Sequence, residues 1–250
     1  MCNHKQLLAM IIGILLILCL IVYLTVSFCK NVLYETFINY KSSENMNNIF
    51  GYANKYDPYV KPLIVNNICS LEKCKEIINY CTDKLSDSEI VGGKHLNIRN
   101  SQQHWILKSN TIAQELIEKV SKMVNMPFEN AEDLQVVRYL PNQYYNEHHD
   151  ACCDNNEKCQ EFIKRGGQRI LTVLIYLNSE FENGETYFKN LNIKMKTTAG
   201  NAIVFYPLQK NNQNNISNKK CHPYALHAGL PVKSGVKWIA NIWFRENKFV

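Results

Sequence analysis

Residues 134–150 read LQVVRYLPNQYYNEHHD. The first seven, LQVVRYL, combine β-branched, aromatic and other apolar side chains in a short run, which is typical of a β-strand. Pro141 and Asn142 end that run, because proline cannot continue the hydrogen bonding of a strand and asparagine favours turns. The stretch closes on two histidines and an aspartate, which are residue types that bind metals. The sequence therefore predicts a strand followed by a turn and a candidate metal-binding segment.

More short β-rich runs follow toward the C-terminus, and Gly, Asn and Pro separate them. They are RILTVLIYL (169–177), NAIVFY (201–206) and VKWIANIWF (236–244). On the N-terminal side, residues 71–85 and 112–124 instead carry apolar side chains at helical spacing, and Ser70 is a plausible N-cap of the first helix. Helices followed by many short strands predict an α+β chain. We expect a double-stranded β-helix (jelly-roll) core with supporting N-terminal helices.

The most hydrophobic stretch is LLAMIIGILLILCLIVYLTVSF, residues 7–28, which contains no charged residue. A helix needs about 20 apolar residues to cross the hydrocarbon layer. A cleaved signal peptide is the alternative, but its apolar part is shorter and ends at small residues, which are missing here. We therefore expect a transmembrane signal-anchor at 7–28 between a short cytoplasmic N-terminus (1–6) and a stalk or linker (29–61). Residues 62–250 are enough chain for one domain.

The compartment is predicted from cysteines, because the charges that flank the apolar stretch nearly cancel. Seven cysteines lie in the predicted domain, where an oxidising lumen would let some of them pair. Asn215-Ile216-Ser217 also matches the glycosylation acceptor pattern. We expect a single-pass type II membrane protein with its domain in the endoplasmic reticulum or secretory lumen. The cysteine spacing leaves the disulfide connectivity open and lacks the paired C-x2-C motifs of zinc sites.

Composition and charge exclude several classes of protein. With 46% hydrophobic and 20% charged residues, the chain is neither disordered nor collagen-like nor a coiled coil. The net charge of +6 is spread along the chain, and no basic run is longer than Lys219-Lys220. We therefore expect no nucleic-acid partner.

The histidines and aspartate at the end of the opening stretch read EHHD, residues 147–150. If this segment is extended, His148 and Asp150 project to one side and His149 to the other. A second histidine on a facing strand would complete a triad of two histidines and one carboxylate, the arrangement of non-haem Fe(II) oxygenases. His227 is the candidate for that position. Taken alone, adjacent histidines beside an acid also fit a solvated turn.

Lys237 lies ten residues after His227 in a strand that is otherwise apolar or aromatic. Strand alternation allows its side chain to point to water. The other interpretation is a single buried cation that binds an acidic ligand.

Five motifs follow one another in the chain. They are YLPNQYYNEHHD (139–150), RILTVLIYLN (169–178), NGETYF (183–188), GNAIVF (200–205) and HAGLPVKSGVKW (227–238). In this order they resemble the prolyl 4-hydroxylase family of the Fe(II)/2-oxoglutarate-dependent dioxygenases, and the likeness covers about residues 62–250. Two positions depart from the family pattern, because Asn142 and Asn183 stand where the family has glycine. Asparagine tolerates a left-handed backbone, so we expect both turns to survive.

The resemblance implies a set of site residues. It makes His148, Asp150 and His227 the ligands of Fe(II). It pairs Lys237 with the distal carboxylate of 2-oxoglutarate. The pocket around that cosubstrate would be lined by Tyr139, Thr172 and Trp243.

The resemblance also implies an oxidoreductase reaction. The enzyme would hydroxylate peptidyl proline in collagen-like or proline-rich substrates to 4-hydroxyproline, consuming O2 and 2-oxoglutarate and releasing succinate and CO2. L-ascorbate (vitamin C) is the expected reductant. Residues 151–168 would form a loop at the mouth of the site. A dioxygenase that acts on another peptidyl residue or on a small molecule is one alternative, and an inactive jelly-roll binding module is another. The four intact residues, His148, Asp150, His227 and Lys237, argue against the inactive module.

Overall fold

A computed structural model describes residues 59–89, 95–209 and 220–250. The predicted anchor, most of the predicted stalk and the sequon at Asn215 lie outside these residues. Within the described residues, no helix is both long and apolar enough to cross a membrane.

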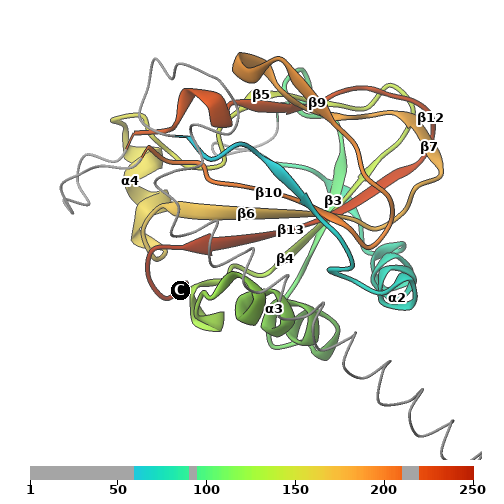
Figure 1. Ribbon diagram of the computed structural model, residues 1–250, viewed down its shortest axis with the longest axis horizontal. Helices are drawn as coiled ribbons and strands as arrows, with labels where there is room; N and C mark the ends of the chain where they lie inside the picture. Colours follow the sequence, from blue (N-terminus) through green and yellow to red (C-terminus); the bar gives the residue numbers. More distant parts are fainter. Residues whose placement is uncertain (1–58, 90–94, 210–219) are drawn as a thin grey trace, which may run out of the picture. The chain divides into compact units, whose positions relative to one another are not determined.

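The larger of two facing layers is a seven-stranded antiparallel sheet (Figure 1). Its strands, in spatial order, are β1 (Leu63–Val65), β10 (Ala202–Phe205), β6 (Arg169–Tyr176), β13 (Lys237–Arg245), β4 (Leu134–Tyr139), β3 (Gln102–Ile106) and β2 (Ser86–Asp87). The four β-rich runs predicted from sequence are β4, β6, β10 and β13 within one or two residues. They lie side by side in the middle of the sheet, where burial on both faces explains their nearly continuous apolar sequence.

The second layer is smaller and carries most of the connections. It contains a four-stranded sheet of β5 (Tyr145–His148), β11 (His227–Gly229), β8 (Thr186–Phe188) and β9 (Ile193–Met195), and a pair of β12 (Val232–Gly235) with β7 (Phe181–Asn183). A cluster of buried side chains from both layers, among them Val137, Tyr176, Phe188 and Phe205, fills the space between them. These facing antiparallel sheets confirm the predicted jelly-roll core.

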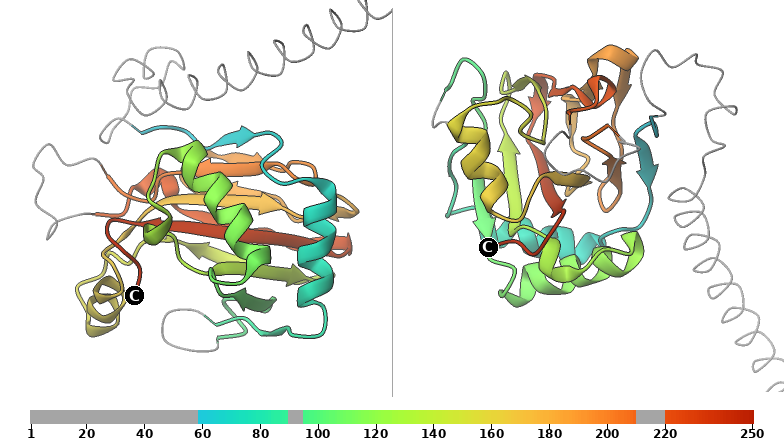
Figure 2. Two further views of the ribbon diagram at one scale, coloured as in Figure 1. Left: turned by 90° about the horizontal axis from the view of Figure 1, so that it is seen from below. Right: turned by 90° about the vertical axis from the view of Figure 1, so that its left-hand side faces the viewer.

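The two predicted helices cover the outer face of the large sheet (Figure 2). Helix α2 (Leu71–Cys81) begins after Ser70, whose hydroxyl accepts a hydrogen bond from the backbone N–H of Lys73 at 3.1 Å. It ends four residues before the predicted limit at 85. Helix α3 (Thr111–Val124) begins after Asn110, whose side chain accepts from the N–H of Ile112. Both helices turn their apolar stripe toward the sheet, as the spacing predicted.

The segment 151–168 is more ordered than the predicted loop, because it contains helix α4 (Glu157–Lys164). Asn156 caps this helix by accepting a hydrogen bond from the N–H of Cys159. Two disulfides also hold the segment, Cys152–Cys159 and Cys153–Cys221. One eight-residue helix with only two buried side chains has too weak an apolar period to be recognised among polar neighbours.

The two asparagines that replace family glycines adopt the left-handed backbone that the turns require. The φ angle is +67° at Asn142 and +59° at Asn183. The expectation that both turns survive is therefore confirmed. The second turn matters for the site, because it presents the carbonyl group of Gly184 to the interior.

The remaining short elements are 3-10 turns. They are η2 (Phe128–Asn130), η3 (Lys189–Leu191) and η5 (Pro223–Ala225). The last of them leads directly into strand β11, which begins at His227.

Candidate active site

Strands β5 and β11 pair so that His148 lies directly opposite His227. Each imidazole is oriented by the backbone carbonyl group two residues before it. His148 Nδ1 lies 2.8 Å from the carbonyl oxygen of Asn146, and His227 Nδ1 lies 2.9 Å from that of Ala225. A carbonyl oxygen can only accept, so both Nδ1 atoms carry the proton and both Nε2 atoms keep a free lone pair. Metal-binding histidines usually donate their other ring N–H to a backbone carbonyl or a carboxylate in this way.

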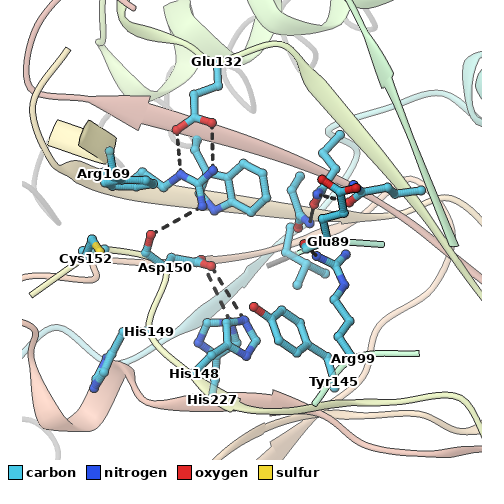
Figure 3. A pocket seen from close by; sticks show the side chains of 18 of the residues that line it. Glu89, Arg99, Glu132, Tyr145, His148, His149, Asp150, Cys152, Arg169 and His227 are labelled. Carbon is cyan, nitrogen blue, oxygen red and sulfur yellow. Dashed lines mark hydrogen bonds and ion pairs between the residues drawn. The ribbon is translucent and has the colours of Figure 1, made fainter. Parts of the chain in front are cut away.

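Asp150 completes a cluster of three side chains (Figure 3). Its two carboxylate oxygens lie 3.8 Å from Nε2 of His148 and 4.0 Å from Nε2 of His227, and the three possible ligand atoms are all within 4.8 Å of one another. Strand β5 ends at His148, so Asp150 lies in irregular backbone rather than in the predicted extended segment. His148 and Asp150 nevertheless share one side, while His149 points away from them, as predicted.

The electrostatics of the cluster suit a divalent cation. Burial acts to raise the pKa of Asp150, but His227, His148 and Arg169 together lower it to about 2. Burial and the neighbouring His227 hold the pKa of His148 well below its usual value. At neutral pH Asp150 is therefore an anion and His148 a neutral imidazole, which are the protonation states that metal binding requires. Two imidazoles and one carboxylate fit Fe(II) and leave further coordination positions open.

Thr172, predicted to line the cosubstrate pocket, lies against the carboxylate instead. From strand β6 its hydroxyl donates a hydrogen bond of 2.7 Å to Oδ2 of Asp150, and the residue is buried. Thr172 therefore orients the acid of the cluster, and the spacing of the motif could not reveal this partner. The other predicted pocket residues, Tyr139 and Trp243, line the same cavity as the cluster.

That cavity has a volume of about 700 Å³ and also contains Lys237. Lys237 is 1% exposed, so the water-facing interpretation of this residue is wrong. Its ammonium group donates a 2.6 Å hydrogen bond to the carbonyl oxygen of Gly184 and lies 5.3 and 5.2 Å from the ring centroids of Tyr139 and Tyr176. Lysine has three N–H donors, so this cation can still bind an acidic ligand.

The surroundings of Lys237 also shift its protonation. Burial lowers its pKa to about 7, and nearby Lys196 acts in the same direction, whereas Glu185 opposes them. An anionic ligand that enters the cavity would stabilise the protonated form of this buried amine, because it supplies the negative charge that the surroundings lack.

One group of charged residues beside the cluster has no place in the sequence-based site. Glu132 is buried and binds two arginines: Nε and Nη2 of Arg169 at 2.6 and 2.8 Å, and Nε of Arg245 at 2.8 Å. The guanidinium of Arg169 stacks 3.6 Å above the ring of Trp243, and its Nη1 lies 3.4 Å from the backbone oxygen of Asp150. The sequence signal for this network is a charged residue at or near one end of three of the apolar runs: Glu132 before 134–140, Arg169 at the start of 169–177 and Arg245 after 236–244.

Similarity to known proteins agrees with this geometry. Residues 134–245 match the family model of the 2OG-Fe(II) oxygenase superfamily. A protein of Acanthamoeba polyphaga mimivirus, provisionally named a prolyl 4-hydroxylase, is 59% identical over 205 residues, which cover 82% of each chain. The chain belongs to the prolyl 4-hydroxylase family of Fe(II)/2-oxoglutarate dioxygenases. Its family implies Fe(II) and 2-oxoglutarate as the metal and cosubstrate.

Two further relatives extend the comparison. Prolyl 4-hydroxylase 1 of Arabidopsis thaliana is 30% identical over 74% of this chain and 68% of its own length. The solved structure of a viral collagen prolyl hydroxylase from Paramecium Bursaria Chlorella virus-1, in complex with 2OG, is 30% identical. It superimposes with a TM-score of 0.56 over 73% of this chain and 94% of the viral one. The jelly-roll framework is therefore shared within the family.

Proposed function

We propose that this dioxygenase hydroxylates peptidyl proline to 4-hydroxyproline in collagen-like or proline-rich chains. The observation that carries the proposal is a single cavity that joins the His148, Asp150 and His227 cluster to the buried ammonium of Lys237. The same cavity offers metal ligands and a cation, which are the partners that the keto-acid and distal carboxylate groups of 2-oxoglutarate need. Relatives named for proline hydroxylation supply the substrate class.

Each residue then has a distinct task. His148, Asp150 and His227 would hold Fe(II), which when bound supplies O2 activation coupled to the oxidative decarboxylation of 2-oxoglutarate. Thr172 keeps the Asp150 carboxylate oriented. The three side chains leave open coordination positions for the cosubstrate and O2.

Other residues of the cavity would position the cosubstrate. Lys237 would bind its distal carboxylate, and Tyr139 and Trp243 would form walls beside it. An ion pair at such a buried site fixes orientation as well as affinity. L-ascorbate would act as the external reductant, as the family resemblance implies.

Aromatic side chains line the cavity, among them Tyr145 and Trp105, which is 36% exposed. Flat aromatic surfaces bind proline-rich segments well, because a polyproline II chain is extended and preformed. An exposed aromatic side chain at the cavity favours a peptide over a small molecule as the substrate.

The proposal is tested by succinate release from the purified full chain, in detergent, with Fe(II), 2-oxoglutarate and ascorbate. We expect a Pro-Pro-Gly repeat peptide to stimulate release, and a matched peptide with alanine in place of proline to leave it at the background rate. Equal stimulation by a lysine-containing peptide without proline would support the alternative target. The absence of succinate, with metal and 2-oxoglutarate both shown to bind, would support the inactive module.

We also propose that residues 7–28 anchor the chain, with residues 62–250 as the catalytic domain in the lumen of the endoplasmic reticulum. The uncharged apolar length of the segment supports this assignment. The full chain should remain with membranes after alkaline carbonate extraction, while a variant that lacks residues 1–29 should not. Glycosylation at Asn215, lost in Asn215→Gln, would report the lumenal orientation. Release of the full chain by carbonate would overturn the anchor.

A further inference from the structure

The three residues of the metal cluster are held by the fold in different ways. Strand pairing fixes His148 and His227 directly opposite each other. Asp150 lies beyond the end of β5, and its backbone belongs to no strand or helix. Asp150 is instead held by contacts beyond its own segment: the Thr172 hydroxyl donates to its carboxylate at 2.7 Å, and Nη1 of Arg169 lies 3.4 Å from its backbone oxygen.

The chain just after Asp150 is held at two adjacent cysteines. Cys152 pairs with Cys159 in α4, seven residues away, so this disulfide closes a short local loop. Cys153 pairs with Cys221 across a separation of 68 residues. All of Cys152, Cys153 and Cys221 line the cavity that contains the metal cluster.

The longer disulfide reaches the segment that leads to His227. Cys221 is followed by His222 and the turn η5, and β11 then begins at His227. The sulfur of Cys221 lies 3.4 Å from the carbonyl oxygen of Ala151, the neighbour of Asp150. The same segment is attached to the chain just after β10 through the N–H of His222, which donates to the carbonyl oxygen of Pro207 at 2.8 Å. Cys153–Cys221 therefore joins the backbone on either side of the metal cluster.

We propose that the Cys153–Cys221 disulfide is a positioning element of the metal site, which fixes Asp150 relative to His227 and so sets the affinity for the metal. This inference rests on the proposed iron site. Opening the disulfide leaves the two histidines in their strand pair and the Thr172–Asp150 hydrogen bond in place, but it removes the covalent link between the segment that carries the carboxylate and the segment that leads to His227. Cys152–Cys159 has no such role, because it ties the segment only to α4.

The two disulfides also differ in accessibility. Cys153 is exposed, whereas Cys159 is buried at 2% exposure. A soluble dithiol should therefore reduce Cys153–Cys221 first. The dithiol gives two electrons and two protons to the disulfide, yielding two thiols, and itself becomes a cyclic disulfide. Metal affinity would in this way respond to the thiol redox state.

The test compares Mn(II) affinity, by calorimetry, among three forms of the full chain in detergent: wild type, Cys153→Ser/Cys221→Ser and the matched Cys152→Ser/Cys159→Ser. We expect the first double variant to bind Mn(II) at least about tenfold more weakly, in the range found when a residue that supports a metal ligand is lost. The second should stay within about twofold of wild type, since it leaves the cross-link between the ligand segments intact. Equal affinity of the Cys153→Ser/Cys221→Ser variant and wild type would overturn the proposal, as would equal losses in both double variants.

A second measurement covers the case in which a variant fails to fold. Wild-type chain is partially reduced by dithiothreitol, freed of reagent under nitrogen, and examined by circular dichroism and by the electron paramagnetic resonance of bound Mn(II). If circular dichroism shows that the fold is retained, the reduced chain should bind Mn(II) more weakly and give a changed Mn(II) spectrum. Reoxidation should restore both the spectrum and the affinity. An unchanged spectrum and affinity in the reduced form would contradict the inference. Failure of the oxidised wild type to bind any Mn(II) would instead contradict the iron site itself.

Discussion

Replacing Asp150 by alanine should abolish measurable binding of divalent metal to the full chain. The carboxylate is the only anion among the three clustered ligands, and it contacts both histidines at 3.8 and 4.0 Å. The loss of a residue that merely supports a ligand already weakens metal binding by roughly 10–100-fold, so the loss of the ligand itself should exceed about 100-fold. Calorimetric titration with Mn(II) measures this change directly.

The matched control is Asp154→Ala. Asp154 lines the same cavity but is exposed and lies outside the cluster. We expect its removal to change the Mn(II) affinity by less than about threefold, the effect of a solvent-screened charge. An Asp150→Ala chain that binds Mn(II) as well as wild type would show that the cluster is not the metal site.

The second large effect is expected for Lys237→Met, which keeps an unbranched side chain one atom shorter than lysine and removes its charge. The distal carboxylate of 2-oxoglutarate would then be buried without a partner. Breaking a buried charge pair from one side costs about 3–5 kcal/mol, so the 2-oxoglutarate concentration for half-maximal succinate release should rise roughly 10²- to 5 × 10³-fold. Lys196→Met is the control, because Lys196 is a neighbouring but exposed cation.

A measurement of metal binding distinguishes a specific loss of 2-oxoglutarate binding from a general loss of structure. The Lys237→Met chain should keep the Mn(II) affinity of wild type, since the ammonium contacts Gly184 and two tyrosine rings rather than the metal cluster. An unchanged requirement for 2-oxoglutarate in Lys237→Met, or an equal loss in Lys196→Met, would show that Lys237 does not bind the cosubstrate.

The depressed pKa of Lys237 adds a pH dependence to cosubstrate binding. With a pKa of about 7, the free amine is protonated below that pH and mostly neutral above it. An anionic ligand needs the ammonium form, so binding must take up a proton at higher pH. The dissociation constant for 2-oxoglutarate should be flat near pH 6–7 and then rise by up to about tenfold per pH unit. The neighbouring phenols of Tyr139 and Tyr176 do not interfere, because burial raises the pKa of each.

The middle of the fold was predictable from sequence because its strands are buried on both faces. Apolar runs of six to nine residues that are rich in β-branched and aromatic side chains are typical of buried strands, and β4, β6, β10 and β13 appear where those runs lie. The short strands of the second layer were not predictable in the same way. Elements of three or four residues such as β5 and β11 take their conformation from their partners rather than from their own sequence.

The site was predictable where a residue type and its spacing decide the chemistry. His148 and Asp150 come together as the alternation of side chains implied, although the strand itself ends at His148. The contact between Thr172 and Asp150 depends on how the two sheets pack, so the spacing of these residues in the sequence could not predict it. The disulfide connectivity was equally hidden, because four of seven cysteines can pair in many ways and only the folded chain selects among them.

The hydroxylated peptide itself provides the most direct test of the proposed function. The full chain in detergent is incubated with Fe(II), 2-oxoglutarate, ascorbate and a Pro-Pro-Gly repeat peptide, and the product is fragmented in a mass spectrometer. We predict the gain of one oxygen atom on proline, with one succinate per hydroxyproline, in wild type and Asp154→Ala and in neither Asp150→Ala nor Lys237→Met. Oxidised proline at the wild-type rate in Asp150→Ala, or succinate formed by the wild type with no oxidised proline, would contradict the account.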